Sequence, residues 1–121
     1  MKTKSIVRAL ATAAWFSSSI AHASSYQGTL TNVTPYNSLV FLGVSGGGFD
    51  GGASSCFANA TSMVYSFDPS TAQGKAILAA ALSAKLTGRL VYIYGNAVCP
   101  GAGNPYNGQG SENMIGIDLK G

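Results

Sequence analysis

Two cysteines, Cys56 and Cys99, carry the clearest chemistry in this 121-residue chain. They are too far apart for the Cys-x-x-Cys spacing that is typical of redox and zinc sites. In an exported protein, an even pair of cysteines favours a structural disulfide, and a reduced redox or metal-binding pair is the alternative. A bond between them would close a loop of about 44 residues and stabilise the fold by about 4 kcal/mol on the chain-entropy estimate.

Groups for acid–base or nucleophilic catalysis are few. The only histidine, His22, belongs to an N-terminal segment that we expect to be removed, so no serine or cysteine triad can form. Asp50 and Glu112, both expected in loops, would form a glycosidase-like pair only if two glycine-rich loops met. The run Ser45–Gly52 lacks the Gly-Lys-Ser/Thr ending of a phosphate-binding loop. The sequence therefore predicts a protein that is not an enzyme and that uses no metal or cofactor.

Side chains suited to binding are more frequent. Tyrosine rings stack on sugars, and amide side chains hydrogen-bond to hydroxyl groups. The stretch from Cys99 to Asn113 is a long Gly-, Pro- and Asn-rich connection, and loops of that length are often functional. In the alternative interpretation, Tyr106 packs over the disulfide and the asparagines serve turns. The candidate ligand-binding residues are Tyr36, Tyr94, Asn104, Tyr106, Asn107 and Gln109.

The N-terminus has the three parts of a secretory signal peptide. Lys2, Lys4 and Arg8 form a basic start, residues 9–20 are uncharged and mostly apolar, and Ala21-His22-Ala23 fits the small-x-small cleavage rule. A membrane anchor is the alternative, but the apolar run is well short of the roughly 20 residues that cross a bilayer as a helix, and no later segment is long enough. We predict a signal peptide over residues 1–23, no membrane span, and a secreted or periplasmic protein.

Removal of that segment changes the charge of the protein. The full chain has a formal net charge of +3. Loss of three basic residues leaves four basic side chains against four acidic ones, so the mature chain is neutral. A neutral chain without clustered Lys and Arg does not indicate binding to nucleic acid. The balanced residues are Lys75, Lys85, Arg89 and Lys120 against Asp50, Asp68, Glu112 and Asp118.

Residues 24–121 are enough for one domain and one modest core. Alternation and β-prone composition predict strands, and the Ala- and Leu-rich segment before Gly88 predicts a helix. We expect the glycine-rich run over residues 45–52 to form a hairpin loop. The order β-β-β-α-β-β predicts a mainly β fold, an OB-like five-stranded antiparallel barrel with one helix, and an open α+β sandwich is the alternative. The expected strands are Gly28–Thr34, Leu39–Val44, Ser62–Phe67, Arg89–Tyr94 and Met114–Leu119, and the expected helix is Pro69–Thr87.

Three details of these strands are also predicted. Tyr36 and Asn37 are the expected turn residues between the first two strands. In residues 89–94, alternation places Leu90, Tyr92 and Tyr94 on one face and Val91 and Ile93 on the other. In the last strand, we expect Ile115, Ile117 and Leu119 to point inward.

The predicted helix has clear end signals. Asp68 is the expected N-cap before Pro69 at the first helical position, Lys85 suits the last turn, and Gly88 is the expected left-handed C-cap. A stripe of small and apolar side chains should pack closely against the sheet or a neighbouring subunit. It consists of Ile77, Ala80, Ala81 and Ala84, bordered by Leu78, Leu82 and Leu86.

Several stretches resemble the small OB-fold binding subunits of bacterial A-B toxins of the subtilase-cytotoxin and typhoid-toxin type. They are Gly28–Val33, Leu39–Leu42, Ala84–Gly88, Arg89–Tyr94 and Met114–Ile117, and they cover about half of the mature chain. The cysteine positions and the glycine-rich run differ from that family. The chain is also similar to small exported bacterial proteins of no known role. The toxin resemblance implies a ring-shaped homo-oligomer, its pore lined by the helix, that binds glycans on host cells.

Taken with the missing catalytic groups, these features predict an exported, non-enzymatic binding module with a glycan or protein ligand. A structural or envelope-associated protein is the alternative.

Overall fold

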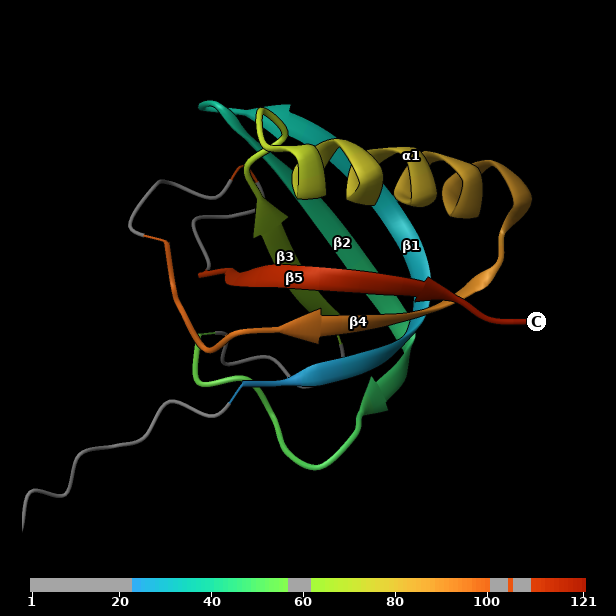
Figure 1. The fold of residues 1–121 in the computed structure, drawn as a ribbon. Helices are drawn as coiled ribbons and strands as arrows, with labels where there is room; N and C mark the ends of the chain where they lie inside the picture. Colours follow the sequence, from blue (N-terminus) through green and yellow to red (C-terminus); the bar gives the residue numbers. More distant parts are fainter. Residues whose placement is uncertain (1–22, 57–61, 101–104, 106–109) are drawn as a thin grey trace, which may run out of the picture.

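The computed structural model describes residues 23–56, 62–100, 105 and 110–121. Its element order is β-β-β-α-β-β, as the sequence predicts (Figure 1). The predicted signal peptide up to His22 lies outside the described residues. The elements are β1 (Ser25–Tyr36), β2 (Leu39–Phe49), β3 (Ser62–Phe67), α1 (Ala72–Thr87), β4 (Leu90–Gly95) and β5 (Glu112–Leu119).

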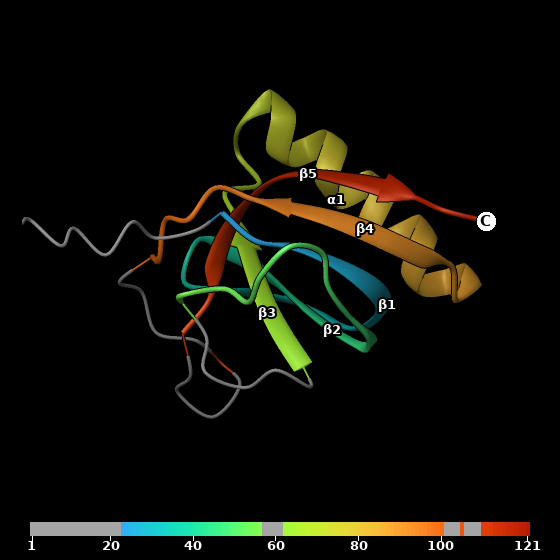
Figure 2. The same cartoon turned by 90° about the horizontal axis from the view of Figure 1, so that it is seen from below.

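The five strands form a closed barrel in the order β1-β2-β3-β5-β4, which confirms the barrel and excludes the open sandwich (Figure 2). All neighbouring pairs are antiparallel except β3 and β5, which are parallel. The expectation of a fully antiparallel barrel was wrong for a topological reason. A closed ring with an odd number of strands cannot alternate in direction all the way round, so one pair has to be parallel.

Residues 45–49 of the glycine-rich run belong to a strand, which corrects the hairpin loop predicted over residues 45–52. β2 continues through it to Phe49, and Gln27 pairs with Gly48 while Thr29 pairs with Ser45, which leaves an extra residue on β2. Gly46 has φ 80°, the left-handed conformation that a glycine adopts at a β-bulge without a steric penalty. The bulge bends β2 and helps to close the barrel, which explains why glycines are tolerated in this strand.

The hairpin between β1 and β2 is one residue later than predicted. β1 runs through Pro35 to Tyr36, and the turn is made by Asn37 and Ser38, both with positive φ (51° and 66°). Two consecutive residues of this conformation form the two-residue turn whose twist matches that of antiparallel strands.

Helix α1 begins later than the sequence predicts. Its N-cap is Thr71, whose hydroxyl accepts a hydrogen bond from the Gly74 N–H at 2.8 Å. The Asp68 carboxylate instead accepts hydrogen bonds from the backbone and hydroxyl of Ser70 in the turn before the helix, and these bonds lower the pKa of Asp68. The predicted C-terminus is confirmed, because Lys85 lies in the last turn and Gly88 is a left-handed C-cap.

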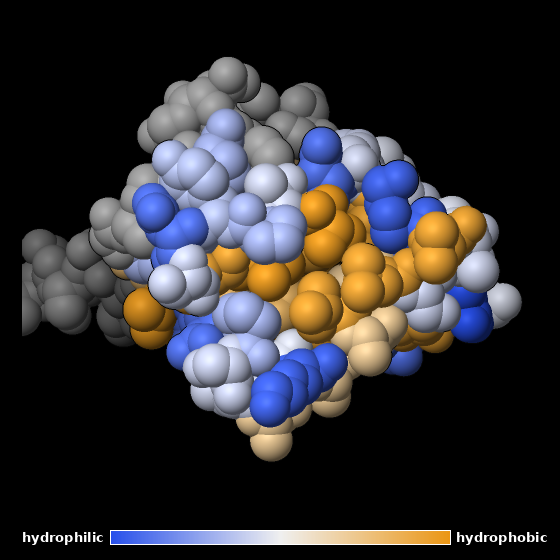
Figure 3. All heavy atoms as spheres, turned by 90° about the horizontal axis from the view of Figure 1, so that it is seen from above, coloured by the Kyte–Doolittle hydropathy of each residue, from blue (hydrophilic) through white to orange (hydrophobic). Residues whose placement is uncertain are grey.

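The small-residue stripe of α1 packs against β1 and β5, as predicted. Ile77, Ala81 and Ala84 are buried together with Gly74, whereas Ala80 is half-buried. Of the bordering leucines, Leu78 is half-buried and packs against the core. Leu82 and Leu86 face outward and are 46% and 86% exposed. Figure 3 looks down on this side of the molecule and shows apolar residues among charged ones.

The core fills the barrel and the space under α1. In β4, Val91 and Ile93 point inward, as the predicted alternation requires. In β3, every residue from Met63 to Phe67 is buried, including the polar Ser66. The core residues are Tyr26, Leu30, Val40, Phe41, Leu42, Val44, Met63, Val64, Tyr65, Phe67, Ile77, Ala81, Ala84, Val91, Ile93 and Met114.

In β5, the predicted inward set is correct for Ile117 and Leu119, which pack against the core, and wrong for Ile115. Tyr94 pairs with Gly116 but Gly95 pairs with Met114, so Ile115 is an extra residue in a bulge. The bulge shifts the alternation by one, so Met114 points inward and Ile115 is exposed.

Candidate functional site

Polar and aromatic side chains form a row across the outer face of the barrel, where β4 lies between β1 and β5 (Figure 1). Gly48 pairs with Gln27, Gln27 with Tyr92, and Tyr92 with Asp118. Residues that pair directly across strands point to the same face of a sheet. Because the adjacent residue Ile93 is buried, this row points outward.

Tyr92 and Tyr94 form an aromatic pair on this face. They lie two residues apart on β4, and their ring centroids are 4.9 Å apart with the planes tilted by 51°. The strand partner of Tyr94 is Gly116, where a Cβ would lie only 3.3 Å from the Tyr94 ring. The absence of a side chain at Gly116 leaves room for that ring, and Tyr94 keeps 41% of its surface exposed.

Charged groups surround Tyr92. Its hydroxyl donates a hydrogen bond of 2.6 Å to the Asp50 carboxylate. This bond raises the pKa of Tyr92, because it favours the protonated phenol, and a hydrogen bond with Ser25 acts in the opposite direction. The Lys120 ammonium lies 5.7 Å from the centre of the Tyr92 ring and 3.2 Å from the carboxylate of Asp118. Tyr92 is thus held in position from two sides, whereas Tyr94 beside it is more open.

A shallow, open hollow of about 520 Å³ adjoins the row. Asp50 lies at its edge, fixed by a 2.8 Å hydrogen bond from its backbone N–H to the Ser25 carbonyl. Glycines in this wall expose backbone groups that larger side chains would cover. The hollow is lined by Gln27, Gly46, Gly47, Gly48, Phe49, Asp50 and Leu90.

The structure describes two of the predicted binding residues, Tyr36 and Tyr94, and does not bring these two together. Tyr36 lies at the C-terminal end of β1 and Tyr94 pairs with Ser25 at its N-terminal end, so the two tyrosines are at opposite ends of a long strand. Tyr36 packs edge-on against Phe41, with ring centroids 6.3 Å apart, and is 46% exposed. The remaining candidates Asn104, Tyr106, Asn107 and Gln109 lie outside the described residues.

The sequence analysis did not single out Tyr92 and Gln27, and it did not predict that Asp50 lies beside them. The alternation in β4 had already placed Tyr92 on the same face as Tyr94, which was a usable signal. Gln27 and Asp50 gave no such signal, because their proximity depends on the β2 bulge and on the pairing of β1 with both neighbours.

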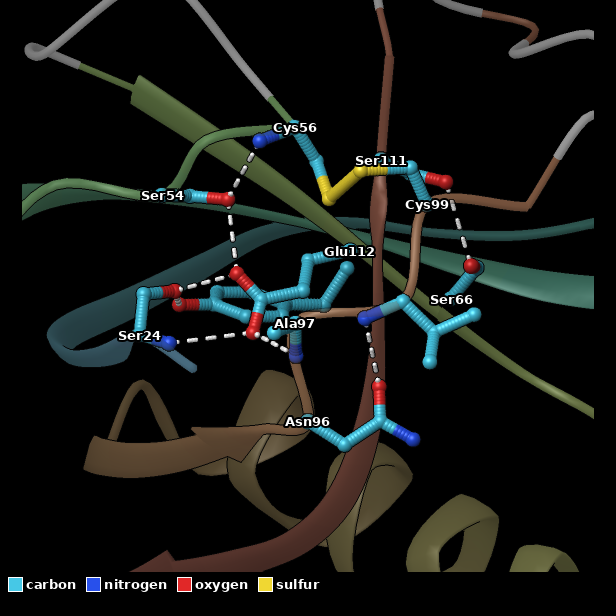
Figure 4. The surroundings of a disulfide bond; sticks show 11 residues. Ser24, Ser54, Cys56, Ser66, Asn96, Ala97, Cys99, Ser111 and Glu112 are labelled. Atoms are coloured by element: carbon cyan, nitrogen blue, oxygen red, sulfur yellow. Dashed lines mark hydrogen bonds between the residues drawn. A yellow bond between two sulfur atoms is a disulfide. The ribbon is translucent and has the colours of Figure 1, made fainter. Parts of the chain in front are cut away.

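The predicted disulfide is confirmed: Cys56 and Cys99 are bonded, with Cα atoms 5.4 Å apart (Figure 4). Close to it lies the buried carboxylate of Glu112, at the start of β5. One of its oxygens, Oε1, accepts hydrogen bonds from the hydroxyls of Ser24 (2.7 Å) and Ser54 (2.6 Å). The other, Oε2, accepts from the backbone N–H groups of Ser24 (3.0 Å) and Ala97 (2.9 Å).

Glu112 is 0% exposed, so a substrate cannot reach its carboxylate to use it together with Asp50. Among the residues that the structure describes, no group of three or more His, Cys, Asp or Glu side chains is placed to hold a metal ion. Within the same residues, no helix is long and apolar enough to cross a membrane.

No model of a known protein family matches the chain, and no curated protein matches it either. The resemblance to toxin binding subunits therefore stays a prediction, and function has to be inferred from the surface around Tyr92 and Tyr94.

Proposed function

We propose that the chain is an exported, non-enzymatic binding domain that holds a carbohydrate against the outer face of β1 and β4. The observation that carries this proposal is the Tyr92–Tyr94 pair, with Tyr94 exposed and Tyr92 half-buried, beside the Asp50 carboxylate and the glycine-lined hollow. A tyrosine ring offers an apolar face to the C–H groups of a sugar, while a carboxylate and an amide such as Gln27 accept and donate hydrogen bonds to its hydroxyls.

The charge of this face favours a neutral sugar over nucleic acid. Aromatic rings also stack on bases, but single-stranded nucleic acid needs a positively charged groove for its phosphates. Here the rings lie between two carboxylates, Asp50 and Asp118, and the ammonium of Lys120 is already paired with Asp118. The neutral charge expected for the mature chain also favours a neutral sugar over nucleic acid as the ligand.

Binding without catalysis is supported by the position of the acidic groups. Acid–base cleavage of a glycosidic bond requires two carboxyl groups on either side of the bond. Asp50 is the one carboxylate that lines the hollow within the described part of the chain, and Asp118, outside the hollow, is paired with Lys120. Two features support the export part of the proposal, the Cys56–Cys99 disulfide and the signal-like N-terminal sequence.

A glycan array probed with the exported protein tests the proposal, followed by titration calorimetry with the best ligand. We expect Tyr94→Ala to weaken binding at least about fivefold, because stacking on an exposed ring contributes on the order of 1–3 kcal/mol. Tyr36→Ala is the matched control, since it removes a similarly exposed tyrosine at the far end of β1 and should leave affinity unchanged. Absence of any glycan ligand, or equal affinity of the Tyr94→Ala protein, would contradict the proposal.

A further inference from the structure

Among the described residues, which start at Ala23, burial begins at Ser24. Ala23 is exposed, whereas Ser24 is only 1% exposed and every polar group it has is hydrogen-bonded. Its N–H and its hydroxyl donate hydrogen bonds to the Glu112 carboxylate. Its hydroxyl also forms a 2.7 Å hydrogen bond with the Tyr65 hydroxyl. Its carbonyl accepts a hydrogen bond of 2.8 Å from the Gly95 N–H. The boundary between exposed and buried chain therefore coincides with the cleavage site predicted after Ala23.

Glu112, the partner of Ser24, is a buried carboxylate with which no basic side chain of the described residues forms an ion pair. Across the described ranges, the one ion pair joins Lys120 to Asp118. All four basic side chains after residue 23 belong to those ranges: Lys75, Lys85, Arg89 and Lys120. Four hydrogen-bond donors surround the carboxylate, and none of them carries a positive charge (Figure 4). Buried carboxylates are usually paired with a cation, because hydrogen bonds alone offset only part of the desolvation cost.

We infer that Glu112 is the binding site for the α-ammonium group of the processed chain. Hydrolysis of the Ala23–Ser24 peptide bond by a signal peptidase consumes one water, leaving a carboxylate on Ala23 and an amine on Ser24 that takes up a proton at neutral pH. The nitrogen lies 3.0 Å from Glu112 Oε2 before cleavage. Cleavage thus converts a neutral amide donor into the missing cation without moving it.

The site accommodates this group closely. Gly95 lies under the carboxylate, and a Cβ at that position would overlap with Glu112 and approach the Ser24 carbonyl. Ala23, the residue attached to this nitrogen, is exposed, so its departure opens that side of the nitrogen to water, which can solvate the remaining ammonium protons. A charge-assisted hydrogen bond is about twice as strong as a neutral one. Removal of the signal peptide then stabilises the barrel, and the precursor is the less stable form.

This inference rests on the export part of the proposed function and does not depend on carbohydrate binding. Its test uses the full chain expressed with its own N-terminal segment in an exporting bacterium. Intact mass and N-terminal sequencing of the exported protein should show Ser24 as the first residue. A second chain carries Gly-Ser inserted between Ala23 and Ser24, so that its product has an ordinary amide at Ser24. Glycan binding, measured on both products, should be the same, which separates a failure of this inference from a failure of the carbohydrate proposal.

Denaturant unfolding of the two products measures the effect of the charge. We expect the unfolding equilibrium constant of the product beginning at Ser24 to be at least tenfold smaller than that of the extended product. In a Glu112→Gln background, that ratio should fall below twofold, because the carboxylate that binds the ammonium is gone. Asp118→Asn, which removes the exposed ion pair, should leave the tenfold ratio intact.

A second measurement requires no substitution in Glu112, which matters if Glu112→Gln does not fold. An amine-reactive acylating reagent at neutral pH should modify the α-amine of the Ser24 product at least tenfold more slowly than that of the extended product. Equal stability of the two products, equal acylation rates, or a mature chain that begins elsewhere than at Ser24 would each overturn the inference.

Discussion

Burial of the Glu112 carboxylate removes water from both of its oxygens, and the protein replaces that water with two hydroxyls and two backbone N–H groups. An ion taken out of water without such partners costs several kcal/mol, while each hydrogen bond to a charged group contributes about 1.5–3 kcal/mol. The balance depends on keeping all four donors in place. Any residue whose size fixes the position of the carboxylate therefore affects stability as strongly as the donors do.

Gly95 is such a residue, and we predict that Gly95→Ala destabilises the fold by about 2–3 kcal/mol. The added methyl group would occupy the space of the Glu112 carboxylate, which has no alternative position in a closed network. Gly48→Ala is the control, because a Cβ at Gly48 meets nothing within 4 Å, and we expect a change within about 0.5 kcal/mol. Urea unfolding of both variants measures the difference. A Gly95→Ala protein as stable as the control would contradict the close packing of Glu112.

The buried Tyr65 hydroxyl leads to a prediction on alkaline pH. Burial raises the pKa of Tyr65 well above its ordinary value of 10.0, the hydrogen bond with Ser24 acts in the opposite direction, and the charge of Glu112 adds to the rise. Above pH 10.0 the unfolded chain loses this proton while the folded protein keeps it, so stability falls as pH rises, by up to about 1.4 kcal/mol per pH unit. Below that pH, Tyr65 makes no contribution to the slope.

Comparison with Tyr65→Phe isolates this effect. At neutral pH the variant should lose about 1 kcal/mol with its hydrogen bond to Ser24. Between pH 10 and 11.5 its free energy of unfolding should decline less steeply than that of the unmodified protein, so that the two curves converge. Parallel curves throughout that range would show that Tyr65 titrates alike in the folded and unfolded states.

At the scale of single helices and strands, the sequence correctly predicted features that depend only on residues close together in the chain. The alternation in β4 and the glycine C-cap at Gly88 depend on neighbouring residues, and both predictions are confirmed. Two predictions were wrong, the inward position of Ile115 and the loop over residues 45–52. In both places a β-bulge shifts the pairing of two strands, β4 with β5 at Ile115 and β1 with β2 in the glycine-rich run. Asp68 was misassigned because Asp and Thr are both good N-caps, and only the fold shows that Thr71 reaches the free N–H of Gly74.

The same reasoning applies to the candidate site. Tyr94 could be found from the sequence because exposure of one strand face follows from alternation. The neighbourhood of Tyr92, Asp50 and Gln27 could not, because these residues come from β4, the end of β2 and β1, and only closure of the barrel brings them together. The role of Glu112 was hidden for a similar reason, since its partners Ser24, Ser54 and Ala97 are spread over the whole domain.

Helix α1 gives the sharpest prediction at this scale. Ala81 is completely buried against the barrel, so Ala81→Leu forces extra carbon atoms into a filled space and should cost about 1–3 kcal/mol. Ala79→Leu adds the same atoms on the exposed side of the helix and should change stability by less than about 0.5 kcal/mol. Thermal unfolding of the two variants tests the orientation of the helix. Equal melting temperatures would show that Ala81 does not face the core.

For the whole molecule, the disulfide and Glu112 act on the same two segments. Ser54, next but one to Cys56, donates to Glu112 Oε1 and accepts from the Cys56 N–H at 3.1 Å. On the other side of the bond, Ala97 N–H donates to Oε2 two residues before Cys99. The covalent bond therefore joins the two segments that enclose the carboxylate (Figure 4). We expect loss of the bond to weaken this network as well as to free the unfolded chain.

Replacement of both cysteines by serine tests this at the scale of the whole fold. The bridge spans a sequence separation of 43 residues, and the chain-entropy estimate for a loop of that size gives a loss of about 4 kcal/mol. That is a large part of the roughly 5–15 kcal/mol that keeps a domain folded, so the double variant should unfold at much lower denaturant concentration.

Loss of the bridge should also have a local effect on the Glu112 network. Without the bridge, the two segments that enclose Glu112 open more often. The Ala97 amide should therefore exchange its hydrogen faster, relative to the Ile93 amide in the core, than it does in the unmodified protein. Denaturant unfolding and amide hydrogen exchange measure the two effects separately. A double variant within 1 kcal/mol of the unmodified protein would show that the barrel does not depend on the bridge, and unchanged exchange at Ala97 would show that Glu112 holds the two segments without it.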